Sequence, residues 1–155
     1  MPDPRIEAAL RDATDTEDLA IGPGALDAVA EVFGRTFAER PAMVVADATT
    51  WGVAGERVQQ ALAAGRPTEA PYRFPPDTFV QAEYGNVERL REALGTHQAV
   101  PVAVGSGSLN DLVKRAAHEV GRPYLSVATA ASMDGYTAFG AAITKQGYKQ
   151  TLTCP

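Results

Sequence analysis

Residues 99–111, which read AVPVAVGSGSLND, combine a continuous apolar run with a turn rich in glycine and serine. The run at 99–104 is typical of a strand buried on both faces, because its apolar residues do not alternate with polar ones. Residues 108–120 then favour a helix, which Gly121 and Pro123 end. A strand, a tight turn and a helix in this order predict one unit of a parallel sheet.

The rest of the chain repeats this alternation. Short apolar runs predict strands at 43–46 and 124–127, and a proline-rich stretch contains a further strand candidate at 72–74. We expect helices at 6–13, 25–39, 53–64 and 84–94. Residues 142–144 and 148–153 flank Gln146-Gly147 and predict a β-hairpin. The expected fold is α/β: a Rossmann-like parallel sheet with helices on both faces, plus a carboxy-terminal hairpin.

Composition limits the class of protein. The 155 residues are 45% hydrophobic and 21% charged, which suits one domain with a sizeable core. A net charge of −5 disfavours nucleic acid as a partner, because a phosphate backbone attracts a basic face. Apolar runs stay below the ~18 residues that a membrane span needs. One cysteine and an amino terminus unlike a signal peptide lead us to expect a cytoplasmic protein without disulfides.

The turn at 105–108 is a candidate phosphate-binding site. Its glycines let the backbone approach a pyrophosphate, and the free N–H groups at a helix start favour an anion. It is not the full dinucleotide fingerprint, because Asn110 stands in the place of the third glycine. It also lacks the lysine of a P-loop. A tight turn capped by Ser108 explains the same residues, so both interpretations stay open.

Two other strand ends carry polar residues, and parallel strands bring their carboxyl ends to one edge of the sheet. Asp47 follows the first strand candidate, where it suits either a ribose contact or an N-cap for a helix beginning near Thr50. Residues 129–137 contain hydroxyl side chains and Asp134. They suit phosphate, ribose or polyol oxygens, but spacing alone favours an ordinary loop with a turn at Asp134-Gly135.

The sequence gives little support to metal binding or to serine-hydrolase chemistry. His97 and His118 fall on different expected elements without metal-ligand spacing, and no Gly-x-Ser-x-Gly elbow is present. Asp111 and Lys114 share one helix face with His118. Such a face is more often solvated, with a local ion pair, so we expect these side chains to be exposed. We assign no catalytic or metal-binding residue.

Three segments together resemble the sn-glycerol-1-phosphate dehydrogenases: GSGSLND at 105–111, GRPY at 121–124 and TAASMDGYT at 129–137. These enzymes belong to the wider group of iron-containing alcohol dehydrogenases, glycerol dehydrogenase and dehydroquinate synthase. The resemblance runs from about Ile21 to the last residue. It implies an oxidoreductase of phospholipid biosynthesis that interconverts dihydroxyacetone phosphate and sn-glycerol 1-phosphate, with NAD or NADP as cofactor and a bound metal.

The resemblance also implies roles for individual residues. Asp47 would lie near the adenosine ribose, and Asp134 would contact the phosphorylated polyol substrate. Ala138 departs from the family, which often has a serine there that touches the cofactor. The other cofactor-binding residues implied are Gly107, Ser108, Leu109, Asn110, Asp111, Thr129, Ala130, Ala131 and Ser132.

Members of this family have a second, helical domain that carries one aspartate and two histidines as ligands for zinc or another divalent metal. We expect residues 1–155 to form a single nucleotide-binding domain without it. Such a chain alone would be inactive, would bind cofactor weakly and would self-associate through its uncovered apolar surface. The alternatives are a non-catalytic nucleotide-binding or interaction module, or a related polyol dehydrogenase or dehydroquinate-synthase-like enzyme.

Overall fold

The computed structural model describes residues 3–131 and 135–155. A four-stranded sheet has the order β2-β1-β3-β4, and all three strand pairs are parallel. Every residue of the two central strands is buried, as their continuous apolar runs predict. Ala42 lies opposite Val100 in the register of this central pair. The four strands are β1 (Ala42–Ala46), β2 (Tyr72–Arg73), β3 (Val100–Gly105) and β4 (Leu125–Ala128).

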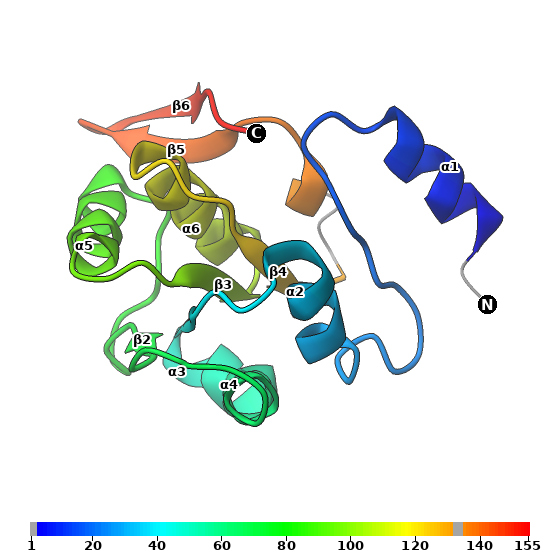
Figure 1. Ribbon diagram of the computed structural model, residues 1–155. Coiled ribbons are helices and arrows are strands. Elements are labelled where there is room, and N and C mark those ends of the chain that lie inside the picture. Colours follow the sequence, from blue (N-terminus) through cyan, green and yellow to red (C-terminus); the bar gives the residue numbers. More distant parts are fainter. Residues whose placement is uncertain (1–2, 132–134) are drawn as a thin grey trace.

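Helices cover both faces of this sheet, which confirms the predicted architecture (Figure 1). Met43 and Val45 of β1 join an apolar cluster with α5 and α6, whereas Val44 and Ala46 join a second cluster with α2 and α4. Successive residues of a strand point to opposite faces, so one strand anchors both layers. The helices are α1 (Pro4–Asp12), α2 (Val29–Phe37), α3 (Ala48–Thr50), α4 (Glu56–Ala63), α5 (Tyr84–Gly95) and α6 (Gly107–Glu119).

Two helices begin more than two residues away from their predicted starts. The helix expected at 25–39 begins only at Val29, because residues 22–28 form successive i to i+3 turns instead. The helix expected at 53–64 begins earlier and is interrupted: α3 leads through the π-helical turn η1 (Trp51–Gly55) into α4. A Cβ on Gly55 would lie 3.0 Å from the Trp51 ring, so a larger residue in this turn would require the ring to move.

The carboxy-terminal hairpin is confirmed. Strands β5 (Ala141–Lys145) and β6 (Tyr148–Leu152) are antiparallel, and Gln146 and Gly147 both have the positive φ angles of a tight hairpin turn. Ile143 is fully buried in the α5–α6 cluster. The hairpin therefore lies over α6 and adds a third layer on that side of the sheet (Figure 1).

This layer overturns the expectation of a solvated face on α6. Asp111 is only 8% exposed and Lys114 only 2%, whereas His118 is exposed. The Lys114 ammonium donates to the carbonyl of Ala138, and the Asp111 carboxylate accepts from the N–H of Ala142. Because the chain following β4 covers this face, the two charges bond to its backbone instead of to water.

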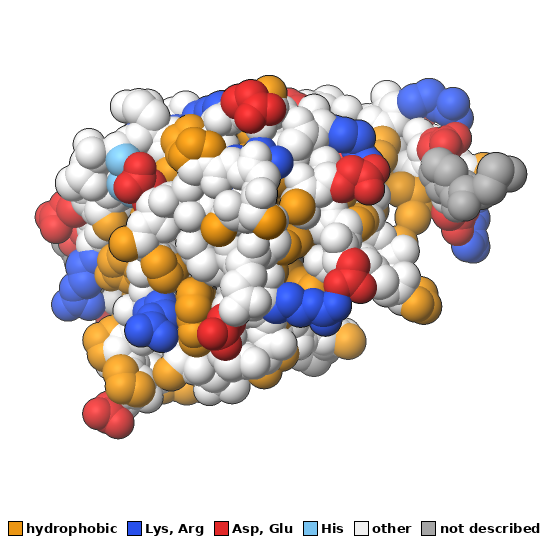
Figure 2. Space-filling model, turned by 60° about the horizontal axis from the view of Figure 1, so that its bottom comes forward, with side chains coloured by type: hydrophobic (Ala, Val, Ile, Leu, Met, Phe, Trp, Pro, Cys, Tyr) orange, Lys and Arg blue, Asp and Glu red, His pale blue; other side chains and the backbone are white. Residues whose placement is uncertain are grey.

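The surface in view carries charged side chains of both signs (Figure 2). Figure 2 shows Lys and Arg side chains interspersed with acidic and apolar ones on the face in view. Within residues 3–131 and 135–155, no helix is both long and apolar enough to cross a bilayer.

Glu119, at the end of α6, links the two helices on one face of the sheet. Its carboxylate accepts hydrogen bonds from the Tyr84 hydroxyl at 3.0 Å, from Arg91 at 3.0 Å and from Arg115 at 2.8 Å. Burial alone would raise the pKa of Glu119, but these hydrogen bonds outweigh it and hold the pKa below its ordinary value. The folded chain therefore favours the ionised carboxylate of Glu119 over the protonated form.

Replacing Glu119 by Gln should lower the free energy of unfolding by about 1–3 kcal/mol near neutral pH. A depressed pKa stabilises the fold above the unfolded pKa, and that contribution is lost as the pH falls through the folded pKa. The difference between variant and parent should therefore shrink on acidification from about pH 7 to about pH 3. Thermal unfolding across this range measures it, with the exposed Glu17→Gln as control. A difference independent of pH would contradict the role of the charge.

Candidate functional site

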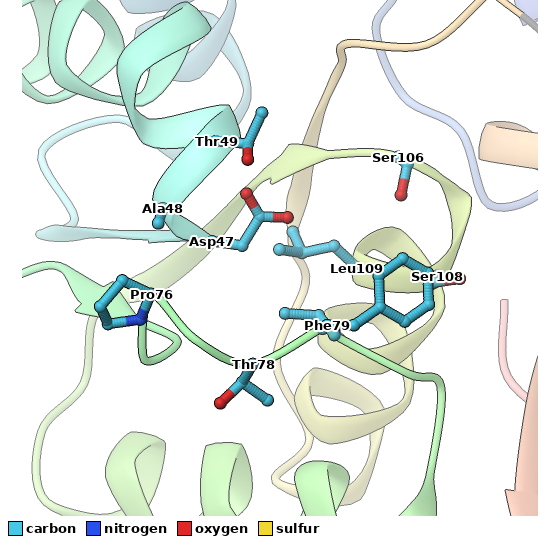
Figure 3. A pocket seen from close by; sticks show the side chains of 10 residues that line it. Asp47, Ala48, Thr49, Pro76, Thr78, Phe79, Ser106, Ser108 and Leu109 are labelled. Atoms are coloured by element: carbon cyan, nitrogen blue, oxygen red, sulfur yellow. The ribbon is translucent and has the colours of Figure 1, made fainter.

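The carboxyl ends of β1 and β3 open onto a cleft (Figure 3). It holds two adjoining cavities, of about 190 and 340 Å³, which share Phe79 and Ser108 as lining residues. The first lies between the end of β1, the loop after β2 and the start of α6. The second lies between the start of α6 and the β5–β6 hairpin. The sequence analysis placed the candidate site at this edge, where open parallel sheets commonly bind ligands.

The start of α6 lines both cavities of the cleft. Ser106 occupies the N-cap position in an extended conformation, and its side chain makes no capping hydrogen bond. The predicted cap at Ser108 is wrong, because Ser108 lies inside the first turn and is exposed. Backbone N–H groups of a first turn without a side-chain cap are suited to an anion.

Gly105 is needed for the close approach of β3 to α6. A Cβ at this position would lie 2.9 Å from the Cβ of Leu109, closer than real side chains approach. Leu109 is itself buried and forms part of the floor of the first cavity. Any side chain at Gly105 would therefore push the start of α6 away from the sheet.

Asp47 caps the start of α3, which is one of the two roles that the sequence suggested for it. Its Oδ1 accepts from the N–H of Thr50 at 2.7 Å, and the Thr50 hydroxyl accepts from the N–H of Asp47 at 3.1 Å. This reciprocal capping box begins α3. The half-buried carboxylate also lines the first cavity. The predicted ribose contact is compatible with this position and stays a prediction.

The loop after β4 is partly described. The N–H of Thr129 donates to the carbonyl of Gly105 at 3.1 Å, which places residues 129–131 beside the end of β3. The Tyr136 hydroxyl donates to the carbonyl of Ala130 at 3.0 Å. Ser132 and Asp134, both predicted to contact ligand, lie outside the described residues.

The predicted cofactor residues do not all face the cleft. Asp47, Gly107, Ser108, Leu109 and Asp111 line its two cavities. Burial raises the pKa of Asp111, and the Ala142 N–H and the Lys114 charge oppose this rise.

Asn110 instead is buried away from both cavities, beside Tyr124. Its amide makes no hydrogen bond of good geometry with the described part of the chain. Burial raises the pKa of the Tyr124 phenol, and the neighbouring Asn110 amide partly opposes this effect.

Several lining residues were missed by the sequence analysis. Phe79 is 86% exposed and borders both cavities, and Thr78 lies next to it. Both follow β2, whose carboxyl end was the one strand end not considered as part of the site. Lys149 and Thr144 line the second cavity from the hairpin. No local pattern marks them, because only the docking of the hairpin brings them to the cleft.

The described residues do not fit a metal ion. Within 3–131 and 135–155, no three His, Cys, Asp or Glu side chains converge as ligands. The His97 ring is held internally, with Nδ1 accepting from the N–H of Ala99 at 3.1 Å and Nε2 lying 3.2 Å from the sulfur of Met43. His118 is exposed at the end of α6.

Replacing Asp47 by Ala should lower the free energy of unfolding by about 1 kcal/mol, because both hydrogen bonds of the capping box are lost or weakened. Asp47→Asn keeps a capping oxygen and should cost only a fraction of this. Urea unfolding of the two variants measures the difference. Equal losses in both would mean that the charge, and not the cap, is what Asp47 contributes to stability.

Comparisons with known proteins agree with this fold. The family described as "Iron-containing alcohol dehydrogenase" matches residues 20–155. A glycerol-1-phosphate dehydrogenase from Methanosarcina mazei is 35% identical over 137 residues, which are 87% of this chain and 37% of that protein. One from Bacillus licheniformis is 31% identical over 143 residues, 88% of this chain and 34% of that protein. The names of both include the cofactor NAD(P)+.

A solved structure shares the fold. The 2-epi-5-epi-valiolone synthase from Streptomyces hygroscopicus, with NAD+ and Zn2+ bound, superposes with a TM-score of 0.59 at 21% identity. The match covers 76% of this chain and 35% of that one. The chain thus spans about a third of the length of the relatives it matches. Since the family match covers nearly all of the chain, it belongs to the iron-containing alcohol dehydrogenase family.

Proposed function

We propose that this chain is the nucleotide-binding part of a glycerol-1-phosphate dehydrogenase, which interconverts dihydroxyacetone phosphate and sn-glycerol 1-phosphate with NAD or NADP. The observation that carries the proposal is the start of α6, which opens without a side-chain cap into the cleft at the carboxyl ends of β1 and β3. The names of the two relatives, and the NAD+ in the synthase of the same fold, support it.

The described residues fit a dinucleotide. The N–H groups of Gly107, Ser108 and Leu109 and the positive end of the helix dipole suit the pyrophosphate. Asp47 borders the first cavity together with Ser108 and Leu109, where a carboxylate accepts from ribose hydroxyls and repels a 2′-phosphate. When bound, the nicotinamide supplies the hydride, and these residues hold and orient the cofactor. In this proposal Asp134 contacts the phosphorylated polyol.

The metal has a separate place in the proposal. Because the described residues do not converge on a metal site, we place its ligands in that part of the relatives which this chain does not match. Residues 1–155 then act as one nucleotide-binding domain, and turnover requires the complementary part. The proposed compartment is the cytoplasm, where the buried thiol of Cys154 stays reduced. Self-association stays a prediction.

Ser108→Asp tests the site because its two effects have opposite signs. A carboxylate in the first turn of α6 interacts favourably with the helix dipole, by about 0.3–1 kcal/mol, so stability should be kept or raised. The same carboxylate would repel a pyrophosphate in the cleft. We expect the dissociation constant for NADH to rise by about tenfold or more, which corresponds to roughly 1.4 kcal/mol. Isothermal titration and thermal unfolding of the same samples measure both effects.

Ser108→Asn is the matched control, because it has nearly the same size as the Asp variant and no charge. It should bind NADH within about threefold of the parent chain. If the parent binds no NADH at all, the proposed function fails. If Ser108→Asp binds NADH as tightly as the parent, the dinucleotide does not lie against the start of α6.

A further inference from the structure

Lys114 is a buried cation that bonds only to backbone within the described chain. It is 2% exposed, and its ammonium donates to the carbonyls of Ala138 at 2.5 Å and Gly140 at 3.4 Å. Burying an ammonium is costly unless its hydrogen bonds are satisfied. An apolar side chain of similar length would fill the same space without that cost, so packing alone does not require a lysine here.

Asp111, one turn earlier on α6, complements this contact. Its carboxylate accepts from the N–H of Ala142 at 3.2 Å, and the Lys114 charge favours its ionised form. Two neighbouring charges of one helix thus bond to opposite ends of the segment 138–142. The arrangement offers carbonyls to the cation and an N–H to the anion, so each charge has a matched partner.

The segment that Lys114 holds is fixed on its other side as well. Gly140 has a φ of +85°, and its N–H donates to the carbonyl of Cys154 at 2.6 Å. A Cβ on Gly140 would lie 2.7 Å from the Thr151 side chain, so the backbone passes directly against the hairpin. Towards β4, Tyr136 bonds to the carbonyl of Ala130. Tyr136 and Gly140 are therefore both held by hydrogen bonds to other parts of the described chain.

We propose that Lys114 is a positioning residue, whose ammonium fixes the segment 138–142 relative to the cofactor; Ala142 of this segment lines the second cavity. This inference rests on the proposed function. The first turn of α6 faces the pyrophosphate, and Lys114 lies two turns further along the same helix. At 1.5 Å per residue, the distance between them is set by the helix at about 10 Å. Fixing residues 138–142 before binding removes an ordering cost that the cofactor would otherwise meet.

Lys114→Met tests the contact between the ammonium and the carbonyls of Ala138 and Gly140. Methionine keeps most of the side-chain volume and removes the hydrogen-bond donors. Two measurements are compared: hydrogen exchange of the amides in 138–142, and the dissociation constant for NADH. We expect exchange in this segment to quicken by about tenfold or more and NADH affinity to fall by a similar factor. Lys114→Gln retains uncharged donors, and should recover part of both losses.

Arg115→Met is the matched control on the adjacent residue. Arg115 also donates to a backbone carbonyl, that of Thr153 at 2.8 Å, and it bonds to Glu119. Its loss should lower the melting temperature and leave NADH affinity within about twofold. An effect confined to melting temperature in Lys114→Met, or equal losses of affinity in both variants, would overturn the positioning role while leaving the cofactor site intact. Absence of NADH binding by the parent chain would overturn both.

Discussion

Burial of β1 and β3 on both faces is the constraint on which the rest of the structure depends. Neither strand leaves a residue in water, so apolar helices must cover the sheet above and below. Chain connections between parallel strands then run through those helices, and the strand ends gather at one edge. The cleft, the capped start of α3 and the open start of α6 all lie at that edge. The position of the candidate site thus follows from the burial of the two central strands between layers of helices.

Much of this was predictable because it is local. Continuous apolar runs located β1 and β3, and Gln146-Gly147 located the hairpin turn. The burial of Asp111 and Lys114 was not predictable. On an isolated helix these residues form an exposed polar face, and only the chain that returns over α6 supplies their backbone partners. Helix spacing describes which residues share a face, but not what covers it.

The candidate site, too, was predictable from the sequence only in part. Asp47 was placed correctly at a strand end, and its capping bonds do not conflict with a place beside the cleft. Asn110 was grouped with the turn by its sequence position, yet a helix rotates its fourth residue away from the cleft and towards Tyr124. Phe79 was missed because β2 is only two residues long and offers almost no apolar pattern. Short elements contribute side chains that periodicity cannot locate.

The register of the central pair has a consequence for how the chain folds. Ala42 and Val100 are separated in sequence by β2, α4 and α5, so the core pairing must close a long loop and forms slowly. The β5–β6 hairpin is local and closes quickly, but Ile143 has nothing to pack against until α5 and α6 lie on the sheet. We therefore expect Asp111 and Lys114 to lose their water late in folding, after the central strands have paired.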